Sequence, residues 1–90
     1  MRYEVNEDSV LGIDDEGKVL ARIDFPLVEK GVVDINHTQV DGSLRGQGVA
    51  GELMSRAVDA IGSAGLRART SCSYAERWFQ KHPERKDLLA

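Results

Sequence analysis

The stretch DGSLRGQGVAGELM, residues 41–54, decides the fold that we predict for this chain. Three of its glycines, Gly46, Gly48 and Gly51, stand where apolar residues begin to recur at helical spacing. Because glycine has no Cβ, the backbone here can adopt positive φ angles and a ligand can approach it closely. A helix that begins here leaves about four backbone N–H groups without intrahelical partners, at the positive end of its dipole. The stretch therefore predicts a strand-to-helix turn that can hold a pyrophosphate, with Arg45 adding a charged hydrogen bond.

Two familiar phosphate motifs do not fit this turn. No Gly-Lys-Ser or Gly-Lys-Thr ending is present, which excludes an NTPase P-loop. GQGVAG, residues 46–51, has the Gly-x-Gly-x-x-Gly spacing of a dinucleotide fold, but it does not follow a first strand, and no acidic residue ends a following strand. A glycine turn that only packs tightly is the alternative. In the phosphate-binding interpretation, Gln47 and Val49 contribute backbone N–H groups rather than their side chains.

Apolar patterning on either side of the glycines predicts an α+β fold. Upstream, short apolar runs separated by turn residues have the pattern of an antiparallel meander. Downstream, the helical stripe ends near Gly62 or Gly65, and a further strand and a short helix follow. The predicted elements are strands over 10–13, 19–23 and 32–40, a helix from 48, a strand over 66–72 and a helix over 74–82. We therefore expect a mostly antiparallel sheet, two main helices, and one helix crossing between two parallel strands.

Length and composition predict one small soluble domain over residues 1–90. Such a chain buries about 60–70% of its unfolded surface, so either a monomer or a homodimer is expected. Its net charge of −3 argues against nucleic-acid binding, and no apolar run approaches the ~20 residues of a membrane span. The single cysteine, Cys72, can form neither an internal disulfide nor a structural zinc site, so we expect a cytoplasmic protein without a metal.

RGQGVA, residues 45–50, is similar to the acyl-CoA signature Gln/Arg-x-x-Gly-x-Gly/Ala of the GNAT N-acetyltransferase superfamily. The longer stretch HTQVDGSLRGQGVAGELMSRAVDAI, residues 37–61, with SCSYA at 71–75, resembles a small branch whose members are about as long as this chain. The resemblance implies a minimal GNAT-like fold that holds acetyl-CoA between two splayed strands. It also implies that the pyrophosphate rests on residues 46–51 and that the pantetheine arm pairs with residues 36–40 like an added strand.

The same resemblance assigns a set of residues to cosubstrate binding. These are Asn36, His37, Thr38, Val40, Arg45, Gly46, Gln47, Gly48, Val49, Ala50 and Gly51. Larger members of the superfamily have terminal strands that complete the acceptor side. We expect no counterpart of these strands after the last predicted helix, so the acceptor pocket is expected to be incomplete or shared with a second subunit.

Three residues are candidates for catalysis, and each has a structural alternative. Cys72 would be a nucleophile if Arg69, His37 or a helix N-terminus lowers its pKa, and otherwise it is a small buried apolar residue. His37 would be a base or the partner of Cys72, or a core histidine; a bulge in its strand would change its face. Tyr74 would donate to the departing sulfur of coenzyme A, or pack with Trp78 and Phe79.

The resulting prediction is an acetyl-CoA-binding N-acetyltransferase that moves acetyl from the thioester to an unidentified amine, of a small molecule or a protein lysine. Transfer would occur by direct attack or through Cys72. The alternative is a coenzyme A-binding module without catalysis, acting as a sensor or partner subunit. A phosphate-binding fold of another kind is a third possibility, and it predicts that ADP-like ligands compete as well as coenzyme A.

Overall fold

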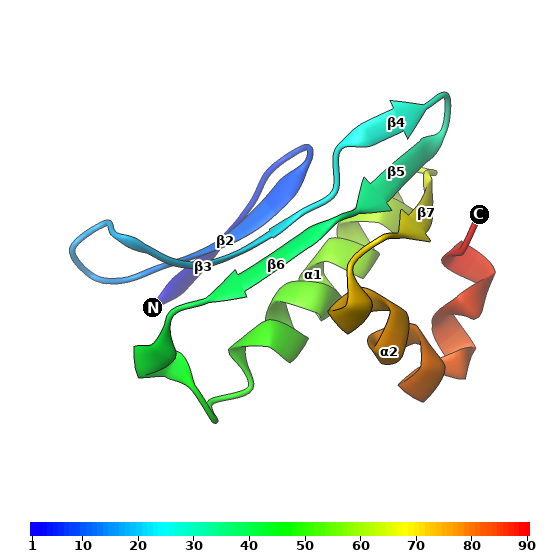
Figure 1. Cartoon of the computed structure of the whole chain (residues 1–90). Helices are drawn as coiled ribbons and strands as arrows, with labels where there is room; N and C mark the ends of the chain where they lie inside the picture. The colour runs from blue at the N-terminus through cyan, green and yellow to red at the C-terminus, as the bar shows by residue number, and fades with distance from the viewer.

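The computed structural model describes all 90 residues and contains seven strands and two α-helices (Figure 1). The strands are β1 (Arg2–Val5), β2 (Ser9–Ile13), β3 (Val19–Asp24), β4 (Leu27–Glu29), β5 (Val32–Ile35), β6 (His37–Val40) and β7 (Arg67–Thr70). The helices are α1 (Val49–Ser63) and α2 (Ser73–Lys81), with short 3₁₀ turns at Gly42–Leu44 and Pro83–Leu88. The predicted α+β class is confirmed.

A four-stranded antiparallel sheet in the order β1-β2-β3-β6 forms the larger layer. The β2–β3 turn is stabilised by Asp14, whose Oδ1 accepts N–H groups of Glu16 and Lys18 at 2.9 and 2.8 Å. The turn also uses Gly17 at a φ of 84°, a conformation that glycine adopts without strain. The predicted meander is therefore present.

A second sheet of three strands, in the order β4-β5-β7, contains the parallel pair. β5 and β7 are parallel and are joined through α1, as the helix-between-strands order predicts. The short edge strand β4 was not predicted from the sequence; it pairs with β5 in an antiparallel arrangement that contains an irregularity. Three residues are too few to show a clear alternating pattern.

The prediction of a single strand over residues 32–40 is wrong in one respect. Asn36 divides this segment into β5 and β6, which belong to different sheets. The Asn36 N–H donates to the Asp24 carbonyl at 3.2 Å, and His37 is also opposite Asp24 in the register. Two residues facing one define a β-bulge, which bends a strand and reverses the faces of the residues that follow.

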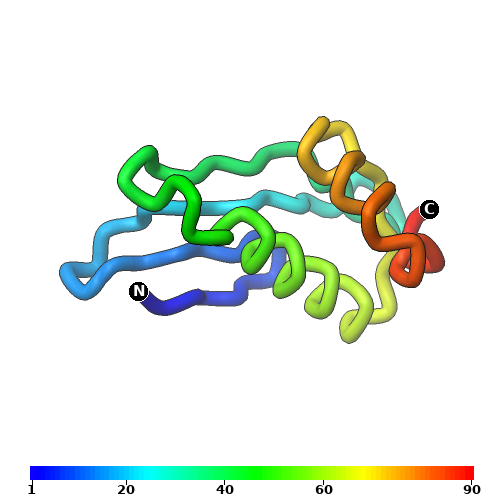
Figure 2. Tube along the Cα trace, turned by 90° about the horizontal axis from the view of Figure 1, so that it is seen from below, coloured from blue at the N-terminus to red at the C-terminus, as the bar shows by residue number.

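The helix α1 covers one face of the larger sheet and packs beside α2 (Figure 2). Its apolar stripe is buried as the periodicity predicts, and consists of Val49, Leu53, Met54, Ala57, Val58 and Ile61. These side chains meet Val10, Ala21, Ile23, Val33 and Ile35 of the strands in one core. The longest helix has 15 residues, and no helix has the length and hydropathy needed to cross a membrane.

The second helix begins one residue earlier than predicted and changes the position of the cysteine. The strand predicted over 66–72 covers only Arg67–Thr70, and Cys72 is the N-cap residue of α2 rather than a strand residue. Trp78 and Phe79 are buried, with their rings edge to face at 5.2 Å, as the packing interpretation predicts. His82 stacks on the Trp78 ring, at 3.9 Å between ring centroids.

Candidate functional site

The candidate site begins where β5 and β7 stop pairing. The carbonyl of Ile35 accepts N–H groups of both Ser71 and Cys72, at 3.2 and 3.1 Å, and this is the last contact of the parallel pair. Beyond it, β6 continues along the line of β5 while the chain after β7 turns into α2 (Figure 1). From this point the backbone of β6 and the start of α2 diverge (Figure 1).

The edge of β6 that faces away from β3 has unpaired backbone groups, because β6 is the last strand of its sheet. The N–H of Asp41 donates to Leu20 at 2.7 Å, and Gln39 lies opposite Arg22 in the same ladder. Since backbone groups alternate along an antiparallel ladder, those of Thr38 and Val40 point away from β3. An extended ligand can therefore pair with Thr38 and Val40.

The glycine turn lies after the other end of β6. Gly46 and Gly48 have φ angles of 80° and 72°, and Gly48 is the N-cap residue of α1. Five backbone N–H groups here have no acceptor within the protein, those of Gly46, Gly48, Val49, Ala50 and Gly51. The N–H of Gln47, by contrast, donates to Leu44 at 3.2 Å, so this predicted donor is already paired. The turn has the donors and the dipole of an anion site.

The charges around this turn leave it positive. Arg45 is exposed and forms no ion pair. Glu52, in the first turn of α1, is paired with Arg56 at 2.9 Å, and the Arg56 guanidinium lies 4.5 Å from the ring centre of Tyr3. The negative charge of Glu52 near the glycine turn is thus offset by the cation paired with it.

The thiol of Cys72 lies where β6 and α2 diverge, with its Sγ 3.6 Å from the Thr38 hydroxyl oxygen. Burial raises the pKa of this thiol, but N–H groups at the start of α2, above all that of Ala75, and the Thr38 hydroxyl lower it by more. The net result is a pKa below the ordinary thiol value. Because Sγ makes no well-aligned capping hydrogen bond to α2, we attribute the effect of the helix to the positive field at its N-terminus.

Tyr74 extends from α2 towards the first turn of α1. Its hydroxyl oxygen is 3.9 Å from the position that a Cβ on Gly51 would occupy, so it borders the glycine turn. Burial, and secondarily the nearby Cys72 thiolate charge, raise the pKa of Tyr74. The phenol therefore stays protonated at neutral pH and can act as a hydrogen-bond donor.

His37 is exposed, which excludes the core-histidine interpretation. Its Nε2 lies 3.4 Å from the amide oxygen of Gln39, on the outer face of the sheet. The bulge at Asn36 reverses the faces, so that Thr38, and not His37, contacts the Cys72 sulfur. The sequence assigned only a binding role to Thr38, and its hydroxyl was missed because locating the bulge requires the register with β3.

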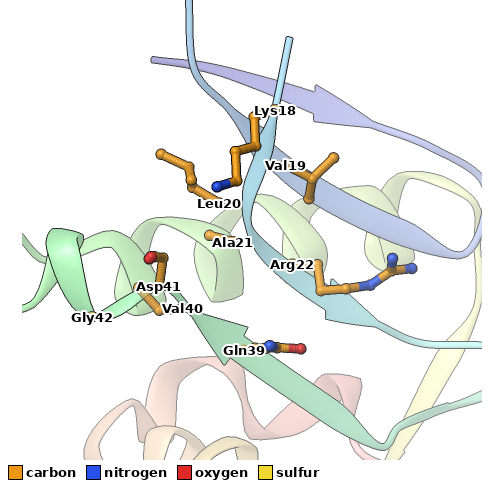
Figure 3. A pocket seen from close by; sticks show the side chains of 9 residues that line it. All are labelled: Lys18, Val19, Leu20, Ala21, Arg22, Gln39, Val40, Asp41 and Gly42. Carbon is orange, nitrogen blue, oxygen red and sulfur yellow. The ribbon is translucent and has the colours of Figure 1, made fainter. Parts of the chain in front are cut away.

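A separate cavity of about 580 Å³ lies against β3 and β6 near the glycine turn (Figure 3). Figure 3 shows α1 behind the strands, with Arg22 and Gln39 projecting from neighbouring positions on β3 and β6. The lining residues are Lys18, Val19, Leu20, Ala21, Arg22, Gln39, Val40, Asp41 and Gly42. No sequence pattern pointed to this cavity, since it is formed by two strands distant in the chain.

Comparison with known proteins shows which family this chain matches. The family model described as GCN5-related N-acetyl-transferase matches residues 2–88. Protein NATD1 of Bos taurus is 34% identical over 59 residues, which are 66% of this chain and 52% of that protein. Protein NATD1 of Homo sapiens is 32% identical over 59 residues. The chain spans about half the length of the curated relatives that it matches.

Solved structures show the same fold. A GCN5-like protein from Staphylococcus aureus, studied by NMR, has a TM-score of 0.79 and 29% identity, over 99% of this chain and 87% of that one. YhbS from Escherichia coli, a GNAT family N-acetyltransferase crystallised with CoA, has a TM-score of 0.62 and 26% identity, over 69% of this chain and 38% of that one. Tetrahymena GCN5 has a TM-score of 0.67 at 18% identity, over 81% and 48% of the two chains, and shows the fold alone.

Proposed function

Because the chain belongs to the GCN5-related N-acetyltransferase family, we propose that it binds acetyl-CoA between β6 and α2 and transfers the acetyl group to an amine. One observation carries this proposal. The open edge of β6 has at one end the turn at Gly46 and Gly48, with its unpaired N–H groups, and at the other Cys72 with Thr38. A ligand with a pyrophosphate at one end and a thioester at the other fits this arrangement.

Binding would use the backbone at both ends of the ligand. The free N–H groups from Gly46 to Gly51 would hold the pyrophosphate, with Arg45 adding a positive charge. The pantetheine amides would pair with Thr38 and Val40, adding a strand to the edge of β6. The complex of the relative YhbS with CoA supports this choice of ligand over other pyrophosphates.

Direct transfer is the simpler of the two routes. The nitrogen of a neutral amine attacks the thioester carbon, the C–S bond breaks, and the coenzyme leaves as a thiolate. His37 would accept the proton that the amine loses, since it is the exposed first residue of β6. Tyr74 would donate a hydrogen bond to the leaving thiolate, because its raised pKa keeps the phenol protonated at neutral pH.

The second route passes through an acyl-enzyme. The Cys72 thiolate attacks the thioester carbon and releases coenzyme A thiolate, and the amine then attacks the new thioester and regenerates Cys72. The lowered pKa of Cys72 increases the thiolate fraction near neutral pH, and the hydroxyl of Thr38 stabilises that thiolate. The acceptor amine, of a small molecule or of a protein lysine, would approach from the exposed side of β6.

A second candidate function, coenzyme binding without transfer, is favoured by a specific observation. The side-chain contact to the Cys72 sulfur comes from Thr38, which is not a base, while His37 is directed towards Gln39. In that case the protein would act as a sensor or partner subunit for acetyl-CoA.

Intact-protein mass spectrometry with acetyl-CoA separates these functions. Under native conditions the proposal requires a 1:1 complex, and no complex would refute it. Under denaturing conditions an acetyl group of ~42 Da on the wild-type chain, absent from Cys72→Ala, would establish the acyl-enzyme route. A non-covalent complex alone would leave direct transfer or pure binding, which release of free coenzyme A thiol in the presence of mixed amines then distinguishes.

A further inference from the structure

A single carboxylate, that of Asp34 on β5, holds the junction between β7 and α2. Its Oδ1 accepts the backbone N–H of Ser71 at 3.1 Å, and its Oδ2 accepts the Ser71 hydroxyl at 2.5 Å. The second distance is typical of a hydrogen bond from a hydroxyl to a carboxylate, which is stronger than one between neutral groups. Asp34 forms no ion pair, so both of its oxygens are engaged with this one residue.

The side chain of Asp34 points away from the core, whereas the thiol of Cys72 packs against it. Val33 and Ile35, the neighbours of Asp34 on β5, are buried, and side chains alternate between the two faces along a strand. Cys72, by contrast, is half-buried against the core. A contact from Asp34 can therefore reach the cysteine only through Ser71, the residue that precedes the N-cap of α2.

Ser71 in turn fixes the backbone at Cys72. The N–H of Ser71 is shared between Asp34 and the Ile35 carbonyl, and that carbonyl also accepts the N–H of Cys72 at 3.1 Å. The chain then enters α2 with Cys72 as the N-cap residue, at φ −89° and ψ 126°. This conformation places Sγ near the N–H groups at the start of α2 and 3.6 Å from the Thr38 hydroxyl oxygen. A rotation of the backbone at Ser71 would move the sulfur relative to both.

We propose that Asp34 is a positioning residue for the thiol of Cys72. By holding Ser71 through two hydrogen bonds, it fixes the N-cap conformation that directs the sulfur towards Thr38 and the start of α2. The inference rests on the proposed function, because that function gives the thiol its use at the thioester. Its test, however, titrates the thiol in the free protein and needs no acetyl-CoA.

The charge of Asp34 and its hydrogen bonds act on the thiol in opposite directions. Removing a nearby negative charge favours the thiolate and lowers the pKa of Cys72. Releasing Ser71 instead takes the sulfur away from the groups that favour the thiolate, and so raises that pKa. The sign of the change therefore identifies which effect dominates. The other ionisable residues on the surrounding elements are kept in every variant; they are Tyr74 and Glu76 on α2, His37 on β6, and Arg69 on β7, which is paired with Glu29.

The test is the pH profile of Cys72 alkylation by iodoacetamide, followed by intact-protein mass spectrometry, which is specific because the chain has one cysteine. In Asp34→Ala the midpoint is expected to rise by about half a pH unit or more, which lowers the alkylation rate at pH values below the midpoint about threefold. Asp34→Asn loses the charge but keeps an oxygen that can accept the Ser71 N–H. Its midpoint should therefore lie at or below that of wild type.

Asp14→Ala is the matched control, because the Oδ1 of Asp14 also accepts two backbone N–H groups. These bonds lie in the β2–β3 turn, at the end of the molecule away from α2 (Figure 1). The variant should melt at a lower temperature than wild type and keep the wild-type midpoint. A general loss of stability would then be distinguished from the expected shift.

A folded Asp34→Ala protein with an unchanged midpoint would show a purely structural role, and a lowered midpoint would show an effect of charge alone. Either result overturns the inference. If Asp34→Ala does not fold, Ser71→Ala decides, since it removes only the hydroxyl bond at an exposed position. Its midpoint should also rise, and an unchanged value would refute the positioning role. Failure of the wild-type protein to bind acetyl-CoA would refute the proposed function and leave the titration result as it stands.

Discussion

Replacement of Gly48 tests the anion site most directly, because its backbone conformation and its surroundings have separate effects. Gly48 has a φ of 72°, and a Cβ added to it would meet no atom within 4 Å. The variant Gly48→Ala therefore causes no clash in the free protein. The variant should lose about 1–2 kcal/mol of folding stability, because a residue with a Cβ is strained in the left-handed region. For a domain of this size, that corresponds to a decrease in melting temperature of about 4–16 °C.

The affinity for coenzyme A should fall for a different reason. The empty space beside Gly48 is where the pyrophosphate is proposed to lie, so a Cβ there, and still more the branched side chain of Gly48→Val, displaces it. We expect coenzyme A affinity to fall at least about tenfold in Gly48→Ala, which is ~1.4 kcal/mol. Gly48→Val should abolish binding in any fraction that remains folded by circular dichroism.

Gly31→Ala provides the matched control. Gly31 has a φ of 78° and equally open surroundings, but it lies in the β4–β5 turn at the other end of the molecule (Figure 1). Its loss of stability should equal that of Gly48→Ala, with wild-type affinity for coenzyme A, measured by calorimetry. If both variants bind coenzyme A equally well, the turn is not the phosphate site. If Gly48→Ala has the same melting temperature as wild type, the argument from backbone strain is wrong.

Two further variants probe the opposite ends of the site. Arg45→Ala should weaken coenzyme A binding by about 1 kcal/mol. This is the low end for a charged hydrogen bond, because Arg45 is exposed. An unchanged affinity by calorimetry would show that Arg45 is not part of the site. Thr38→Val should raise the pKa of Cys72, since the hydroxyl favours the thiolate. The pH profile of Cys72 alkylation by iodoacetamide should then shift to higher pH than in wild type, whose midpoint we expect to lie below the ordinary thiol value. A wild-type midpoint at or above that value, or no shift in the variant, would contradict the assigned contacts.

The parts of this protein that local sequence determines were predictable from the sequence. The apolar stripe from Val49 to Ile61 identified α1, and the glycines at 46 and 48 located its start, because periodicity and positive φ are properties of a short segment. The parallel pairing of β5 and β7 followed from a helix lying between two strands. These features located the glycine turn, whose motif indicated the family.

Tertiary structure alone decided what surrounds the cysteine. Asn36 forms a bulge only because it meets Asp24 of β3, and that bulge turns Thr38 towards Cys72 and His37 towards solvent. The cysteine itself became a helix N-cap, and the field of α2 then lowers its pKa. The register of a strand and the electrostatic field at Cys72 both depend on residues far apart in the chain, so no pattern within a short window of sequence predicts them.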